Sequence, residues 1–309
     1  DVALERVKGA TSLTRVTSGQ QQGSRWGLRG TEDLGGGMKA TFLLESGFNA
    51  DVGTLGQGGR LFGRQGYVGL GGGWGTVRLG RQYTPMDDIA GIIGTKVYDV
   101  VSVVPIIGNG DYNRVDNAIT YVSPTIANTV FQLQYSLGDE RVSTNPSADF
   151  GKQVSGHALY AQGPWTLGLS LMQVADADGA LAGKQGRDAL LFVGAYDFGP
   201  VKLTGYYDVE DKAVEKLKLL GVAAAFKVGQ NTVVSVGAAQ AKNVNGSAAA
   251  ASDDAKIYTL QATHNLSKRT ALYGHVTSVS NDAASALGFN SPVAGSSSNG
   301  IQVGIRHRF

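Results

Sequence analysis

The sequence predicts an all-β fold: one 16-stranded antiparallel transmembrane β-barrel with its third long loop folded into the lumen. Three observations support this prediction. Along most of the chain, short segments alternate between apolar and polar side chains, as half-buried strands do. Tight turns alternate with longer polar loops between these segments. One long loop, residues 81–114, is too apolar to lie in water.

The composition limits the classes of protein that fit. Gly accounts for 45 of 309 residues and Cys is absent, which excludes a disulfide scaffold, a thiolate metal site and cysteine catalysis. A net charge of +2 predicts no strong attraction to nucleic acid. No run of eighteen apolar residues is present, so transmembrane helices are excluded, whereas a barrel with a wet lumen is not. No linker divides the chain, and we interpret residues 1–309 as a single domain.

The predicted strands follow one another from the first residue to the last. In the second of them, Trp26 and Leu28 lie on one face, opposite Arg25 and Arg29. The sixteen segments cover residues 1–8, 24–31, 38–48, 61–70, 76–82, 118–123, 130–137, 153–162, 165–174, 189–198, 201–209, 217–227, 232–241, 256–264, 270–280 and 300–309. Alternating strands also build soluble sandwiches and propellers. The connections between the strands are therefore needed to choose between these folds and a membrane barrel.

Those connections fall into two alternating sets. The tight set lies near Asp33, Gly72, Pro124, Gly163, Gly199, Gly229 and Ser267. The longer set covers residues 9–21, 50–59, 81–114, 138–152, 175–187, 210–216, 243–254 and 281–299. An even number of strands, with short turns on one rim and long loops on the other, is typical of outer-membrane barrels. Backbone groups in lipid have to be paired, so we expect the sheet to close and both termini to lie on the short-turn rim.

Residues 81–114 break this rhythm. Apolar clusters at 89–93 and 100–107 need a surface to pack against, and both flanking segments are predicted barrel strands. We therefore expect the loop to fold inside the barrel, where it narrows the lumen. This interpretation makes the protein a pore with a constriction.

Several motifs resemble those of the general diffusion porins of Gram-negative outer membranes. They are SRWGLRGTEDLGGGMKATFLLESGF, LFGRQGYVGLGGGWGTVRLGRQYTP, YNRVDNAITY and a closing strand that ends in Phe309. The resemblance implies a homotrimer of sixteen-stranded barrels and passive passage of small hydrophilic solutes. Members of that family begin with a further half-strand, so we expect one before Asp1, where no signal peptide is present.

Three arginines are the main candidates for the pore constriction: Arg25, Arg64 and Arg114. Alternation predicts that Arg25 points into the lumen, but it leaves the direction of the Arg64 side chain ambiguous. Arg114 lies where the long loop rejoins the wall. The resemblance implies that they form a basic cluster facing the loop. Arginine stays charged and offers planar donors to carboxylate, sulfate or phosphate, and rings of such residues favour anions. The alternative for each is a rim or interfacial charge.

Secondary pore-lining candidates are of both signs. They are Arg29, Lys39, Arg78, Arg81, Asp87, Asp88, Asp99 and Asp111. Arg81 ranks lower because it falls on the Val77 face, and the pair Asp87 and Asp88 could instead cap backbone amides near Pro85. We expect no enzymatic activity, no cofactor and no metal site, because the four histidines stand singly and no catalytic motif is present.

The sequence thus predicts an outer-membrane channel for passive diffusion that prefers anions. Its expected partners are two further copies of the chain, outer-membrane lipid and lipopolysaccharide, and small anions and hydrophilic solutes, with no nucleic acid. One alternative is a substrate-specific channel for a small anion such as a dicarboxylate or phosphate. A further alternative is a plugged outer-membrane barrel with an enzymatic or adhesive role.

Overall fold

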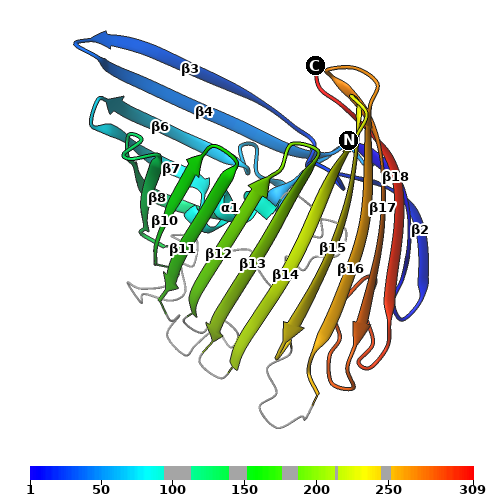
Figure 1. Ribbon diagram of the computed structural model, residues 1–309. Helices are drawn as coiled ribbons and strands as arrows, with labels where there is room; N and C mark the ends of the chain where they lie inside the picture. The colour runs from blue at the N-terminus through cyan, green and yellow to red at the C-terminus, as the bar shows by residue number, and fades with distance from the viewer. Residues whose placement is uncertain (94–112, 139–151, 176–186, 213–214, 245–251) are drawn as a thin grey trace.

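A computed structural model shows a curved wall built almost entirely from β-strands (Figure 1). It describes residues 1–93, 113–138, 152–175, 187–212, 215–244 and 252–309. The strands are β1 (Val2–Lys8), β2 (Ser12–Ser18), β3 (Arg25–Gly35), β4 (Met38–Asn49), β5 (Thr54–Leu55), β6 (Gln65–Gly72), β7 (Gly75–Tyr83), β8 (Arg114–Val122), β9 (Thr129–Ser136), β10 (Gln153–Gln162), β11 (Trp165–Val174), β12 (Arg187–Asp197), β13 (Val201–Lys212), β14 (Glu215–Val228), β15 (Thr232–Lys242), β16 (Ala255–Asn265), β17 (Thr270–Asn281) and β18 (Ser298–His307).

Each of the sixteen predicted strands has a counterpart in this set. Two further strands, β2 and the two-residue β5, lie where the sequence predicts loops. Strand β2 pairs antiparallel with β1, with Val2 opposite Ser18 and Lys8 opposite Ser12. The Ser- and Thr-rich composition of this segment hides its alternation, but Val16 faces outward with 55% of its surface exposed while Thr17 is buried.

Antiparallel pairs link the strands into one continuous sheet. The pairs run from β3 through β4, β6 and β7, then through every strand in order to β18, and finally to β1 and β2. The first and last strands therefore meet, with Val2 opposite Ile305 and Lys8 opposite Asn299. Within the described residues no ladder joins β2 to β3, and Figure 1 shows the β3–β4 hairpin splayed away from that edge.

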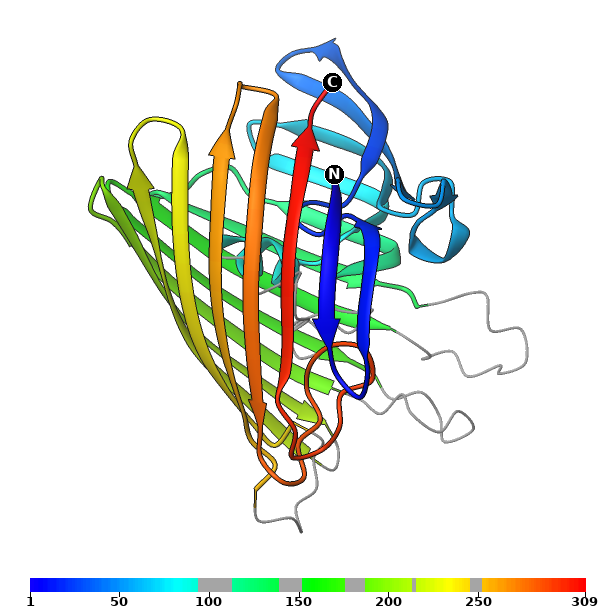
Figure 2. The same ribbon diagram turned by 90° about the vertical axis from the view of Figure 1, so that its right-hand side faces the viewer.

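The two rims differ in the way that the connections predict. Figure 2 shows both termini and the tight turns between β14 and β15 and between β16 and β17 at the upper rim, and the longer connection between β17 and β18 at the lower rim. Several tight turns use Gly at positive φ, for example Gly163 at +56° between β10 and β11, a conformation that glycine adopts without steric cost. We refer to the two ends as the short-turn rim and the long-loop rim.

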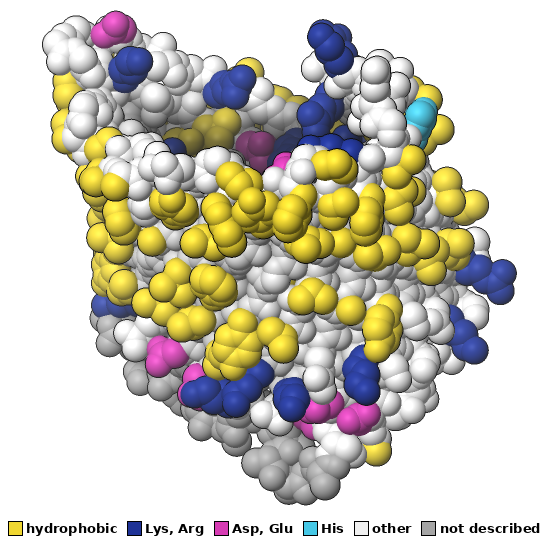
Figure 3. All heavy atoms as spheres, in the orientation of Figure 1, with side chains coloured by type: hydrophobic (Ala, Val, Ile, Leu, Met, Phe, Trp, Pro, Cys, Tyr) yellow, Lys and Arg dark blue, Asp and Glu magenta, His cyan; other side chains and the backbone are white. Residues whose placement is uncertain are grey.

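Side chains alternate across the wall as a membrane barrel requires. On β9, Phe131, Leu133 and Tyr135 expose 45%, 63% and 38% of their surface, whereas Gln132 and Gln134 are buried on the inner face. Figure 3 shows apolar side chains gathered in a belt across the outer face of the wall. An apolar exterior and a polar interior are the reverse of what a soluble protein shows, and they match a surface that faces lipid.

One part of the inner face is apolar instead. Leu191 and Val193 on β12 and Leu219 on β14 are fully buried. Helix α1 (Pro85–Ala90) and the short 3₁₀ helix η2 (Gly91–Ile93) lie against strands β9 to β13 and join this apolar cluster. A second 3₁₀ helix, η1 (Gln57–Gly59), lies in the connection between β5 and β6. No helix in the described part of the chain is long and apolar enough to cross a membrane.

The start of the long loop therefore folds inside the barrel, as the sequence predicts. Ile89 and Ile93 expose 2% of their surface or less, which accounts for the first apolar cluster of the loop. The second cluster, at 100–107, lies outside the described residues.

Candidate functional site

Helix α1 starts as soon as the chain leaves β7, and its first residues explain why. The Thr84 hydroxyl accepts a hydrogen bond from the Asp87 backbone N–H at 3.2 Å, and Pro85 occupies the first turn. Asp87 and Asp88 complete that turn, where the positive end of the helix dipole favours carboxylates. The cap near Pro85 is thus supplied by Thr84.

The opposite side of α1 packs on strands β10 and β11. At Gly168 an added Cβ would lie 2.8 Å from Ile89 Cδ1 and 2.9 Å from Ile92 Cδ1, so the helix reaches the wall because this residue has no side chain. His157 Nδ1 lies 3.2 Å from the Pro85 carbonyl oxygen and donates to it. One of the four histidines therefore helps to hold the loop in the lumen.

Two of the three candidate arginines converge on Tyr83, the last residue of β7. Arg114 donates from a terminal guanidinium nitrogen to the Tyr83 hydroxyl at 2.6 Å, and its guanidinium carbon lies 4.3 Å from the ring centroid. Arg64 donates to the same hydroxyl and lies 5.8 Å from the ring. A cation over an aromatic face is attracted by the negative charge of the ring face. Tyr83 thus holds two guanidinium groups close together.

Glu45 on β4 brings in the third arginine. Arg64 Nε lies 2.5 Å from Glu45 Oε1, and an Arg25 terminal nitrogen lies 3.8 Å from the same oxygen. The Arg64 side chain is 9% exposed and that of Arg25 is 30% exposed. We call Arg25, Arg64 and Arg114 the arginine cluster. Arg25 and Arg64 share the Glu45 carboxylate, and Arg64 and Arg114 share the Tyr83 hydroxyl. Arg64 serves as the buried anchor of the group.

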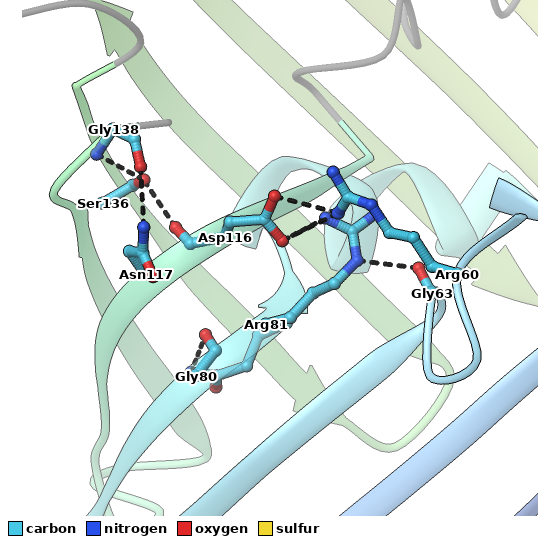
Figure 4. Close-up of polar contacts among 9 residues, drawn as sticks. Arg60, Gly63, Gly80, Arg81, Asp116, Asn117, Ser136 and Gly138 are labelled. Atoms are coloured by element: carbon cyan, nitrogen blue, oxygen red, sulfur yellow. Dashed lines mark hydrogen bonds and ion pairs between the residues drawn. The ribbon is translucent and has the colours of Figure 1, made fainter. Parts of the chain in front are cut away.

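A second set of charges pins both ends of the long loop (Figure 4). Arg60, from the connection before β6, places one terminal nitrogen 2.9 Å from both carboxylate oxygens of Asp116 at the start of β8. Arg81, near the end of β7, lies 2.6 Å from Asp116 and donates from Nε to the Gly63 carbonyl at 2.7 Å. The ladder between β7 and β8 shifts register at Gly80, so alternation along β7 does not predict where Arg81 points.

The two acids of α1 face different neighbours. The Asn113 amide donates to the Asp87 carboxylate. Burial raises the pKa of Asp87, a loop residue outside the spanning strands, to about 7, although the Arg114 charge opposes this shift. Asp88 keeps an exposed side-chain surface, yet burial by its surroundings raises its pKa to about 6, and the charge of Arg78 on β7 opposes this shift. The guanidinium of Arg78 lies 5.3 Å from the Tyr67 ring centroid.

The remaining predicted residues lie elsewhere. Arg29 and Lys39 are exposed on β3 and β4, toward the short-turn rim, and none of the hydrogen bonds or ion pairs of the arginine cluster includes them. Asp99 and Asp111 lie outside the described residues. The structure thus gathers the three main candidates, together with Asp87, at the point where the loop leaves and rejoins the wall.

Comparison with known proteins identifies the protein family. The family model described as Gram-negative porin matches residues 1–284. The chain belongs to the Gram-negative porin family. Outer membrane porin protein 32 of Delftia acidovorans is 33% identical, over 93% of this chain and 84% of that protein. An outer membrane porin protein of Bordetella pertussis is 31% identical, over 95% of this chain and 84% of that protein.

Solved structures agree with this assignment. The anion-selective porin from Comamonas acidovorans superposes with a TM-score of 0.84 at 30% identity, over 100% of this porin and 97% of that chain. The trimer form of OmpT from Vibrio cholerae gives a TM-score of 0.67 at 15% identity, over 100% and 98% of the two chains, which supports the fold alone. This porin is an outer-membrane protein, and its relatives are channels rather than enzymes.

Sequence reasoning missed four side chains that organise the site of this porin. They are Glu45, Arg60, Tyr83 and Asp116. Glu45 offered a signal, as the one acid in a predicted strand that is otherwise largely apolar. The other three gave none, because their partners come from other strands or from loops and are fixed only by the register of the sheet.

Proposed function

We propose that this porin forms a water-filled channel for passive diffusion of small hydrophilic solutes and that it prefers anions. The observation that carries the proposal is the convergence of three guanidinium groups on one carboxylate, Glu45, and one phenol, Tyr83. The group keeps an excess of positive charge next to helix α1. A permeating anion is attracted there and a cation is repelled.

The three arginines contribute in different ways. Arg25 is 30% exposed and Arg114 is partly exposed, so both can approach a passing ion. Arg64 is nearly buried and ion-paired, so it mainly positions Glu45 and Tyr83. A unit charge about 8 Å from an ion contributes between about 0.5 and 2 kcal/mol, depending on the effective dielectric constant. Two such groups suffice for a preference of about tenfold.

Helix α1 supplies the steric part of the mechanism. It begins beside the arginine cluster, two residues after Tyr83, and is held on strands β10 and β11 by Ile89 and by the contact of His157 with the Pro85 carbonyl. Solutes that pass the cluster and α1 are filtered by size and by charge in the same place. The anion-selective porin from Comamonas acidovorans, similar over the whole chain, supports this proposal.

The proposed assembly is a homotrimer embedded in outer-membrane lipid and lipopolysaccharide. The apolar belt on the outer face supports contact with lipid. The trimer form of OmpT is a precedent for such an assembly in this fold. Small anions and other small hydrophilic solutes are the expected cargo.

Reversal potentials across a planar bilayer in a salt gradient test the preference. We expect Arg25→Gln combined with Arg114→Gln to lower the anion/cation permeability ratio by about threefold to tenfold. The matched control combines Arg29→Gln with Lys39→Gln, which removes the same two charges from β3 and β4 outside the arginine cluster and should leave the ratio nearly unchanged. An unchanged ratio in the variant of Arg25 and Arg114 would refute the role of the cluster. Current that saturates with one solute would favour a substrate-specific channel.

A further inference from the structure

Three lysines form a group on the outer face of the wall, away from the channel. Lys218 on β14, Lys242 on β15 and Lys256 on β16 are exposed, and each follows the outward alternation of its strand. On β14, Leu217 and Leu219 are buried inward while Leu220 and Val222 expose 59% and 60% of their surface. The group, which we call the lysine patch, lies where the strands approach the long-loop rim.

The register of the strands puts these like charges side by side. Lys218 is directly opposite Lys242, and Lys256 is opposite Gln240, so it lies diagonally across from Lys242 on the same face. Like charges directly opposite each other in a sheet are destabilising unless a counterion compensates. The patch therefore has a physical reason to bind an anion.

Acidic side chains do not offset the patch in any ion pair of the described residues. The neighbouring Lys216 pairs with Asp211 at 3.1 Å, but none of the ion pairs in this part of the chain includes a lysine of the patch. The adjoining stretches 213–214 and 245–251 contain no Asp or Glu in their sequence. Asp254 lies two residues before Lys256, but it forms no ion pair with another described residue. In Figure 3, basic side chains lie along the lower margin of the apolar belt, at the long-loop end of the strands, with acidic side chains between them.

A groove runs from the patch into the apolar belt. It has a volume of about 280 Å³ and is lined by Leu220, Gly221, Val222, Ala238, Ala239, Gln240, Lys256 and Tyr258. Ala238 stands between Val222 and Tyr258 on the neighbouring strands, so a small side chain forms the floor between two larger ones. The groove has an apolar floor and a cationic end, which fits an amphiphilic ligand rather than a small ion.

We propose that the lysine patch and its groove bind one phosphorylated lipid of the outer leaflet, of the lipid A class of lipopolysaccharide. Its phosphates lie among Lys218, Lys242 and Lys256, and one acyl chain lies over Ala238, between Val222 and Tyr258. The long loops of outer-membrane barrels face outward from the cell, so the patch lies at the depth of the headgroups in that leaflet. Lysine is a common ligand of phosphate, and clustered lysines bind anionic lipid headgroups. The inference rests on the proposed placement of the porin in a membrane with lipopolysaccharide, but the site lies outside the barrel and is independent of ion selectivity.

Native mass spectrometry of the detergent-purified protein tests the site. The probes are bisphosphorylated lipid A, its dephosphorylated form and inorganic phosphate. We expect the triple variant Lys218→Gln, Lys242→Gln, Lys256→Gln to bind bisphosphorylated lipid A roughly a hundredfold more weakly. The control triple variant Lys202→Gln, Lys227→Gln, Lys268→Gln removes the same charge near the short-turn rim and should bind as the unmodified protein does.

A second variant separates lipid from free phosphate. Ala238→Phe fills the groove without changing charge, so we expect weaker binding of lipid A and unchanged binding of inorganic phosphate. Equal losses in the two triple variants would show a general charge effect and overturn the proposal. Equal binding of dephosphorylated lipid A, or no effect of Ala238→Phe, would overturn it as well. The folding of each variant is checked by its reversal potential, which the proposal leaves unchanged.

Discussion

The two inner walls that face helix α1 have opposite chemistry. The wall formed by β11 to β14 presents Leu191, Val193 and Leu219, all fully buried, together with the bare backbone of Gly168. The wall formed by β3 to β8 presents the arginine cluster, Glu45 and Tyr83. One wall holds the loop and the other faces the passage.

This division separates anchoring from selection. The apolar wall stabilises the position of α1 by burial, which carries no information about the charge of a solute. The charged wall acts on ions, and it also holds the ends of the loop through the ion pairs of Arg60 and Arg81 with Asp116. Within the arginine cluster Arg64 has a structural role, because its side chain is buried between Glu45 and Tyr83. Substitutions on the apolar wall should therefore change mainly the stability, and substitutions on the charged wall should change mainly the ion selectivity.

The largest effect is expected on the apolar wall. Leu191→Ala opens a cavity under the loop and should lower the free energy of unfolding by about 2–5 kcal/mol, measured by denaturant unfolding in detergent. Phe192→Ala is the matched control, because this neighbour faces outward with 44% of its surface exposed and leaves no enclosed cavity. A larger loss for Phe192→Ala would contradict the assignment of the two faces.

The next effect distinguishes residues within the charged wall. Arg64→Gln removes charged hydrogen bonds to Glu45 and Tyr83 at a nearly buried position and should destabilise the fold by about 1.5–3 kcal/mol. Arg25→Gln breaks a longer, more exposed contact and should cost less than about 1 kcal/mol. The same unfolding measurement compares the two variants. Equal costs would remove the distinction between the anchor and the ion-facing arginine.

The smallest effect concerns pH. Burial raises the pKa of Asp87 to about 7, so its carboxylate is charged above that pH and partly offsets Arg114. As the pH falls through about 7, Asp87 becomes neutral and the positive potential grows. The anion/cation permeability ratio should therefore rise by up to about twofold between pH 8 and pH 6. Asp87→Asn should weaken this dependence and leave the part that comes from Asp88, whose pKa burial raises to about 6. A ratio that falls with falling pH would contradict the account.

The sequence predicts the fold further than the site, for a physical reason. Every lipid-facing strand has to be apolar on one side, so Phe131, Leu133 and Tyr135 reveal their strand without knowledge of its neighbours. Strand β2 escapes this reasoning because its Ser and Thr residues blur the alternation. The contacts at the ends of the long loop are harder to predict than the strands. Alternation from Val68 would point Arg64 toward lipid, but β6 begins only at Gln65, and the preceding chain turns inward to Glu45.

Contacts that depend on register could not be predicted at all. Arg81 forms an ion pair with Asp116 because the β7–β8 ladder shifts register at Gly80, and no local sequence pattern predicts that shift. The apolar inner wall was equally hidden. Leu191 and Val193 alternate with apolar Leu190 and Phe192, so the segment does not show which of its two faces points into the barrel. Only the apolar loop residues predicted that an inner surface of this kind must exist.

The most direct test of the central claim, that α1 lies in the passage, is thiol labelling during single-channel recording. The chain has no cysteine, so Asp88→Cys on the exposed side of α1 introduces a unique target. A bulky thiol reagent should reduce the current in clear steps, whereas labelling of Ser267→Cys in a short turn should leave it unchanged. Complete labelling of Asp88→Cys with an undiminished current would place the helix outside the ion path and contradict the account.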